Sequence, residues 1–261
     1  MSCMSRSATA ASSHSSSASS EPANTIKTMN PMRHLLLFVL YIIAGSANSQ
    51  QIYVHGGMNR SAFLYEDSEG KVLEGMDPEV GLTLGAGLRL PFKPLNPKWF
   101  YTVGLVYEHY GMRGTSPDAY QHYYEWRTTY LGPDLGVECD LFTLRDRSKN
   151  RKGMTFFIGA AVAPEFLIKG AQTIDHEVYD LRGVEQFDAP FLFLRGTLGV
   201  NYCISNRAAI VVDYAYAHGV RFPGVAPPDD EQLAIRTHNL RVGIAVALPN
   251  CKYCLSKSAG N

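Results

Sequence analysis

A stretch of strict alternation between residues 192 and 216 limits what this chain can fold into. Every second residue from Leu192 to Tyr202 is apolar or glycine, and the interleaved residues are mainly small or polar. After a short connection at Ser205 and Asn206 the alternation resumes through Tyr216. A period of two residues predicts two β-strands joined as a hairpin. Each strand is about ten residues long, which is enough for a tilted strand to cross a bilayer.

Similar segments recur along the chain after residue 50. The clearest is 80–90, where even positions are apolar and odd positions are glycine, threonine or arginine. The eight expected strands are 52–64, 80–90, 99–110, 124–141, 154–168, 192–202, 210–216 and 235–248. This pattern predicts an all-β fold, an eight-stranded antiparallel up-and-down transmembrane β-barrel.

The residues on the less apolar face distinguish a membrane barrel from a soluble barrel with an apolar interior, as in lipocalin-type carriers. That face is rich in Gly, Ala, Thr and Asn, which save space inside a narrow barrel. It also carries eight charged residues, namely Arg89, Glu108, Asp134, Glu138, Glu165, Arg195, Asp213 and Arg241. We expect these side chains to pair inside the lumen as a structural network that plugs it.

The connections between the expected strands alternate in length, as in outer-membrane barrels. The outer loops are expected at 66–78, 111–123, 169–190 and 219–232, and the periplasmic turns at 91–98, 143–153 and 205–208. The middle turn carries the basic residues Arg145, Arg147, Lys149, Arg151 and Lys152. We interpret this run as a solvated turn, the alternative being a contact with a periplasmic partner or anionic lipid.

The N-terminal region predicts export. Residues 1–31 are rich in Ser and Ala and are interpreted as a disordered or mis-started extension. Residues 32–49 have the parts of a signal peptide, with Arg33, an apolar run from Leu35 to Ala44 and small residues at 47–49. The apolar run is too short for a retained anchor. The barrel domain is then 50–250, followed by a tail at 251–261, and the expected location is the cell outer membrane.

Charge and composition exclude other classes. The formal net charge is zero, and no concentrated basic surface argues for nucleic acid as a partner. After the leader, no uninterrupted apolar run reaches the length of a membrane-spanning helix. We expect no cofactor and no metal, and outer-membrane lipid as the main partner, with envelope or secretion proteins as further candidates.

Catalytic residues are not evident. Some small outer-membrane barrels are lipid-modifying enzymes that place Ser or His at the outer rim. The candidates here are His109, His122, His218, His238 and Ser116. No local spacing fixes a hydroxyl, a base and an orienting group together, and no Gly-x-Ser-x-Gly turn is present. We therefore expect no enzyme, the alternative being a small barrel enzyme that modifies membrane lipid.

Two further motifs have plain interpretations. Cys251 and Cys254 form a Cys-x-x-Cys pair, which could be a redox centre or half a zinc site but is interpreted as a tail with or without a local disulfide. Cys139 and Cys203 have opposite strand parities and are not expected to pair. The acidic run 229–231 matches no recognisable calcium loop and is interpreted as solvated.

Two short segments resemble a known family. Gly57-Met58-Asn59-Arg60-Ser61 and Tyr130-Leu131-Gly132-Pro133-Asp134-Leu135-Gly136-Val137 resemble the small outer-membrane β-barrel proteins of the Bacteroidota known as PorT-like. The resemblance implies a barrel of about eight strands in the outer membrane and, for the PorT branch, a role in protein secretion. It implies no active site. The expected function is a structural, adhesive or secretion-accessory one, exercised through the outer loops.

Overall fold

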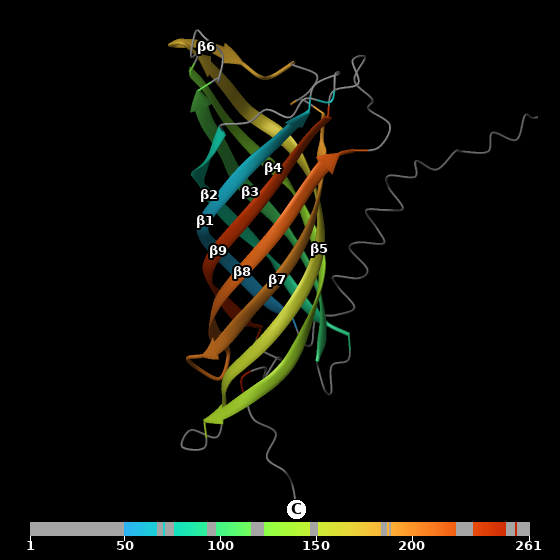
Figure 1. Ribbon diagram of the computed structural model, residues 1–261. Coiled ribbons are helices and arrows are strands. Elements are labelled where there is room, and N and C mark those ends of the chain that lie inside the picture. The colour runs from blue at the N-terminus through green and yellow to red at the C-terminus, as the bar shows by residue number, and fades with distance from the viewer. Residues whose placement is uncertain are drawn as a thin grey trace, which may run out of the picture. The chain divides into compact units, whose positions relative to one another are not determined.

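Eight strands close into an antiparallel ring (Figure 1). The computed structural model describes residues 50–66, 70, 76–92, 98–115, 123–146, 151–183, 187, 189–222, 232–248 and 254. The ring strands are β1 (Gln51–Glu66), β2 (Met76–Pro91), β3 (Trp99–Thr115), β4 (Tyr123–Asp146), β5 (Arg151–Ile174), β7 (Phe191–Cys203), β8 (Ala208–Arg221) and β9 (Gln232–Ala247). Each pairs with its neighbours along the ring, and β9 pairs with β1 to close it. The predicted up-and-down barrel is confirmed.

Closure involves the whole length of the first and last strands. The β1–β9 register runs from Gln51 opposite Ala247 to Glu66 opposite Gln232 without a shift. The hairpin predicted from residues 192–216 is formed by β7 and β8, with Leu198 opposite Tyr214. Because every ring strand has a partner on both sides, the ring leaves no open sheet edge.

The apolar face points outward. On β9, Leu240 is 61% exposed whereas its neighbour Arg241 is 5% exposed, and this alternation repeats around the ring. The exposed large apolar residues include Ile52, Val54, Met58, Val80, Leu82, Leu84, Val103, Leu105, Leu131, Leu135, Ile158, Val162, Leu194, Leu198, Val212, Leu240, Val242, Ile244 and Val246. An apolar exterior of this kind is suited to contact with lipid tails, whereas a soluble carrier has its apolar face inside the barrel. The architecture is that of an outer-membrane protein, as the sequence predicted.

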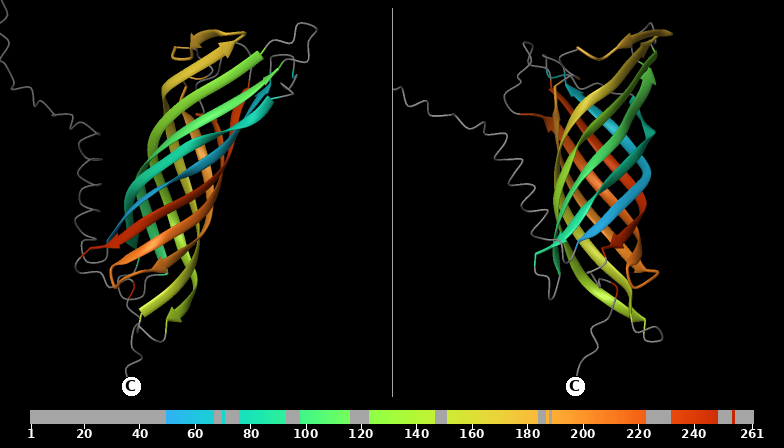
Figure 2. Two further views of the ribbon diagram at one scale, coloured as in Figure 1. Left: turned by 90° about the vertical axis from the view of Figure 1, so that its left-hand side faces the viewer. Right: turned by 180° about the vertical axis from the view of Figure 1, so that it is seen from behind.

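The longer connections share one end of the barrel. They span 67–75, 116–122, 175–190 and 222–231, and those at the other end span 92–98, 147–150 and 204–207. Figure 2 shows that the strand ends joined by the two sets lie at opposite ends of the ring. Strands β4 and β5 run further than predicted, so the expected turn at 143–153 contracts to 147–150. In outer-membrane barrels the longer loops face outward, which makes the β6 end the outer end.

A short ninth strand was not predicted. β6 (Glu177–Asp180) lies in the segment expected as a loop and pairs only with the outer end of β5. The two-residue turn that joins them holds Asp175 at φ 46° and His176 at φ 84°. Positive φ at both turn positions matches the type I′ hairpin, which favours Asn-Gly. Asp175 and His176 therefore both adopt the left-handed backbone region, which is unfavourable for residues other than glycine.

Relieving this turn should stabilise the β5–β6 hairpin. We expect Asp175→Asn combined with His176→Gly to gain roughly 1 kcal/mol locally, because glycine adopts positive φ without a steric penalty. Hydrogen exchange at the β6 amides should slow about fivefold, the equivalent of that gain. The control His176→Ala keeps the Cβ atom and should leave exchange within about twofold of the parent. Equal slowing in both variants would contradict a conformational cause.

Several predictions fall outside the described residues. These are the extension at 1–31, the signal peptide at 32–49, and the acidic run at 229–231. Of the tail at 251–261, only Cys254 is described. In the described part of the chain, no helix is long and apolar enough to cross a membrane.

Candidate functional site: the barrel lumen

Arg195 is the centre of the largest charge cluster in the lumen. Its guanidinium lies 3.2 Å from Glu108 Oε1, 2.9 Å from Asp134 Oδ1 and 3.3 Å from Glu165 Oε1. The three carboxylates come from β3, β4 and β5, and Arg195 comes from β7, so the contacts cross the lumen. The Arg195 side chain is 1% exposed, and those of both glutamates are 0% exposed. Because these charged groups are shielded from water, each is stabilised mainly by its ion-pair partners.

The Tyr110 hydroxyl lies between the two buried glutamates. It contacts Glu108 Oε2 and is 2.8 Å from Glu165 Oε2. One hydroxyl hydrogen serves only one of these contacts, so the other requires a proton on a carboxyl group. Glu108 also accepts hydrogen bonds from Thr83 (2.9 Å) and Asn239 (3.0 Å), in addition to its contact with Arg195. Because Glu108 already has these donors, the hydrogen-bond count predicts that the extra proton lies on Glu165.

Replacing Glu165 with glutamine should be mild. The amide of Glu165→Gln can donate to the Tyr110 hydroxyl and accept from Arg195, as a protonated carboxyl does. We expect a change in unfolding free energy within about 1 kcal/mol, and a loss of about 1–3 kcal/mol for Glu165→Ala, which leaves polar groups unpaired. Urea unfolding in vesicles measures both. The infrared band of a protonated carboxyl should disappear in Glu165→Gln; its persistence would move the proton elsewhere.

A second ion pair lies nearer the middle of the lumen. Arg241 Nε is 2.6 Å from Asp213 Oδ1, and the side chains are 6% and 4% exposed. Close by, the His55 ring stacks on Tyr53 at 5.6 Å between centroids. The His55 ring occupies space that a side chain at Gly85 would need, since a Cβ atom there would lie 2.1 Å from Nε2. Small residues in the inward register thus make room for large polar ones.

The third cluster lies toward the turn end. Arg89 bonds to Glu138 at 2.6 Å and to Asp140 at 2.7 Å, and its guanidinium lies 3.7 Å from the centre of the Phe100 ring. Cation–π contacts of this kind strengthen in a desolvated site. Asp140 was not among the predicted network residues, although it shares the strand parity of Glu138 and the pattern could have identified it.

A small cavity, lined by both charged and apolar residues, lies between the clusters. Its volume is about 50 Å³, and Arg89, Arg195 and Arg241 all contribute to its lining. This volume accommodates a few water molecules. The Nδ2 atom of Asn201, which also lines the cavity, has no hydrogen-bond partner among the described residues. Water in the cavity would satisfy such groups, and the lumen is packed with side chains above and below this cavity.

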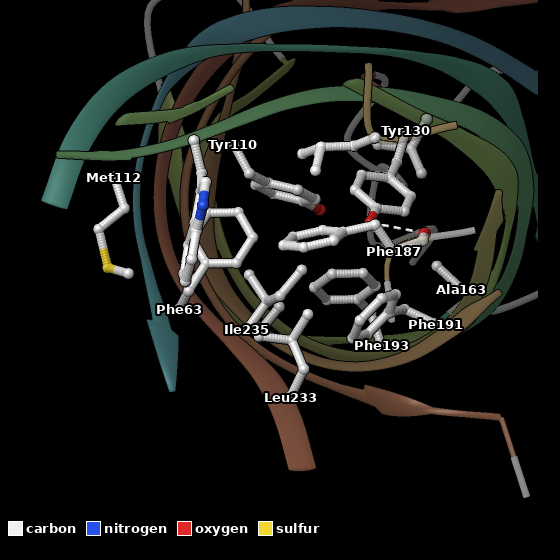
Figure 3. Packing of buried hydrophobic residues seen from close by; sticks show 14 residues of the cluster. Phe63, Tyr110, Met112, Tyr130, Ala163, Phe187, Phe191, Phe193, Leu233 and Ile235 are labelled. Atoms are coloured by element: carbon white, nitrogen blue, oxygen red, sulfur yellow. Dashed lines mark hydrogen bonds between the residues drawn. The ribbon is translucent and has the colours of Figure 1, made fainter. Parts of the chain in front are cut away.

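An aromatic cluster fills the outer end of the lumen. Figure 3 shows rings from several strands packed against one another inside the ring of strands. The buried residues are Phe63, Val106, Tyr110, Met112, Trp126, Tyr130, Ala163, Leu181, Phe187, Phe191, Phe193, Ala217, Leu233 and Ile235. The sequence interpretation missed this plug because it treated the inward face as small or polar. Phe191 and Phe193, which share the parity of Arg195, were the available signal.

A disulfide closes the turn end of the lumen. Cys203 and Cys254 are bonded across 51 residues of sequence and pack with Phe100, Ala209 and Ala247. The tail is therefore tied back to the end of β7, and Cys254 does not form the local disulfide considered from sequence. Cys139 is free and opposes the exposed Trp99. Parity separates Cys139 from Cys203, but it gives no information on a cysteine outside the strands.

Of the candidate catalytic residues, His218 and His238 lie in neighbouring rows of β8 and β9, whereas His109 lies on β3. His109 Nδ1 is 3.1 Å from the Thr129 hydroxyl on β4, whereas His238 Nδ1 is 2.6 Å from the Tyr214 hydroxyl on β8. His218 lies on β8, and His122 and Ser116 lie outside the described residues. Among the described residues, no group of His, Cys, Asp or Glu is placed to hold a metal ion. The side chains of the basic turn at 145–152 are likewise not described.

Comparison with known protein families and with curated protein sequences finds no match. Among solved structures, the chain is similar to the outer membrane protein OprG from Pseudomonas aeruginosa, with 13% identity, a TM-score of 0.41, and coverage of 78% of this chain and 98% of that one. It is also similar to Neisserial surface protein A, with 11% identity, a TM-score of 0.39, and coverage of 75% of this chain and 96% of that one. The fold assignment rests on the strand pairing itself, and neither similarity supports the narrower PorT-like resemblance.

Proposed function

We propose that this outer-membrane barrel is closed and acts through its outer surface, as a structural, adhesive or secretion-accessory component of the PorT-like kind. The observation that carries the proposal is the filling of the lumen at successive levels. The aromatic cluster occupies the outer end, the Arg195 and Arg89 clusters cross the interior, and the disulfide lies at the turn end. An eight-stranded barrel is just wide enough for its own side chains to fill it.

The outer end offers ordered structure for contacts with partners. The last residues of β5, from Ala171 to Ile174, pair with β4 on one side and with β6 on the other. All four residues of β6 are exposed, and Val178 is 70% exposed. Loops and short strands held on a rigid scaffold commonly carry binding function. We place the contacts with envelope or secretion proteins at this end.

Two measurements test the proposal. Protein from washed outer membranes should migrate differently on a denaturing gel before and after boiling, as expected of a closed membrane barrel. In planar bilayers, the purified barrel should show no steady ion conductance. Conductance comparable to that of an open porin would overturn the closed lumen, whereas recovery from the soluble periplasm without a gel shift would overturn the barrel's placement in the membrane.

A non-enzymatic role is part of the proposal. It is supported by the separation of His109 on β3 from His218 and His238 on β8 and β9. A serine-reactive probe applied to the folded barrel in detergent should label no single site. Stoichiometric labelling of one serine would instead favour a lipid-modifying enzyme.

A further inference from the structure

The neighbouring strands β1 and β9 each place an arginine on the lipid-facing side of the barrel. Arg60 on β1 and Arg236 on β9 are exposed, in contrast to the buried arginines of the lumen. Their parity is that of Met58 and Leu240, which are 68% and 61% exposed and belong to the apolar exterior. Charged side chains on this face are costly at the bilayer centre and are tolerated near its interfaces. They therefore mark the outer edge of the apolar belt.

The strand register gathers further polar groups around these arginines. Arg60 is opposite His238, which is opposite Tyr216 on β8. In the next row toward the outer end, Arg236 is opposite His218. Directly opposed residues on one face have Cβ atoms about 5 Å apart. Two guanidinium groups, two imidazoles and two tyrosines thus share one patch, which we call the outer basic patch (Arg60, Tyr214, Tyr216, His218, Arg236, His238).

The outer basic patch is not neutralised within the described part of the chain. Neither Arg60 nor Arg236 pairs with a described carboxylate, whereas exposed Arg127 pairs with Glu79 and Glu125, and exposed Arg182 pairs with Asp180. The donors of Arg182 are thus engaged within the chain, and hydrogen bonds from Arg182 lower the pKa of Asp180 to about 2. Arg60 and Arg236 therefore keep their donors available for an anion from outside the chain.

The patch is also ordered. The Tyr214 hydroxyl is 2.6 Å from His238 Nδ1, and the Tyr216 ring lies 5.2 Å from the His238 ring between centroids. These contacts hold the imidazole on the barrel wall beside Arg60. Tyrosine at the membrane interface can also donate to a headgroup while its ring contacts acyl chains.

We propose that the outer basic patch binds the phosphate groups of lipid headgroups in the outer leaflet. Guanidinium groups bind phosphate through paired, charge-assisted hydrogen bonds, and a second guanidinium beside the first suits a lipid that carries more than one phosphate. The apolar residues directly below the patch contact the acyl chains of the same lipid. The inference extends the proposed function and depends on the membrane placement of the barrel, not on the closure of its lumen.

The test measures lipid binding by the folded barrel. Native mass spectrometry counts molecules of diphosphoryl lipid A retained by the barrel as that lipid is titrated into detergent micelles. We expect the double variant Arg60→Gln and Arg236→Gln to weaken retention about tenfold, since two charge-assisted contacts are lost. The matched control, Arg127→Gln with Arg182→Gln, removes the same charge from paired arginines and should stay within about twofold. Heat-modifiable migration verifies that each variant is folded.

Each other outcome overturns the proposal. Equal weakening in both double variants would indicate a general charge effect, and unchanged retention in both would place the lipid elsewhere. Displacement of lipid A by millimolar inorganic phosphate would assign the patch to free phosphate instead of a lipid headgroup. The variant Arg60→Lys with Arg236→Lys keeps the charge and should retain more lipid than the glutamine pair; retention as low as that pair's would exclude an electrostatic role.

Discussion

Arg195→Ala is expected to lower the free energy of unfolding by about 3–5 kcal/mol, the cost of removing one partner from a buried ionic cluster. The guanidinium serves Glu108, Asp134 and Glu165, and its loss leaves three carboxyl groups together in the lumen. The donors that remain to these carboxyl groups, from Tyr110, Thr83 and Asn239, are all neutral and do not offset the mutual repulsion. Urea unfolding of the barrel in vesicles measures the loss.

The matched control is Arg127→Ala. Arg127 also bonds to two carboxylates, but its side chain is 54% exposed, so its loss should cost less than about 1 kcal/mol. Conductance provides the second readout, because the aromatic cluster and the Arg89 cluster remain in Arg195→Ala. We expect it to stay at the parent level. A large rise in single-channel conductance with unchanged stability would show that Arg195 gates a pore.

The ring of strands was predictable because its signal is local. Whether a residue faces lipid or lumen is decided by its parity, as Leu240 and Arg241 show with 61% and 5% exposure. Parity also assigned the eight charged residues to the inward face, because the assignment requires no knowledge of the neighbouring strands. It could not state which charges meet. Arg195 contacts carboxylates from three strands, at heights set partly by a register shift between Thr129 and Tyr130 in β4–β5.

Features that depend on distant pairing were missed. β6 has exposed residues throughout and no buried face, so its four residues carry no periodic signal. It forms because β5 extends beyond the ring and offers an edge through Ile174. Cys254 lies after the last strand, where parity no longer applies. Its pairing with Cys203 depends on the tail folding back to the barrel end, which no local pattern specifies.

Removal of the Cys203–Cys254 disulfide should have the second large effect on stability. Cys254→Ser opens a loop closed across 51 residues. In the chain-entropy account, a loop of this length contributes about 4 kcal/mol by restricting the unfolded chain. We expect Cys254→Ser to lower the urea midpoint, and reductant to lower the parent midpoint to that of the variant. Cys139→Ser should change neither, because Cys139 is free and sits on the exterior.

Disulfide mapping separates this tether from the local alternative. Non-reducing digestion of protein exported to the oxidising periplasm should yield a peptide linking Cys203 to Cys254. A bond between Cys251 and Cys254 would instead leave Cys203 unpaired and the tail unattached to β7. In that case Cys254→Ser would cost little, because a loop of a few residues restricts the unfolded chain much less than one of 51. The size of the stability loss therefore reports which partner Cys254 has.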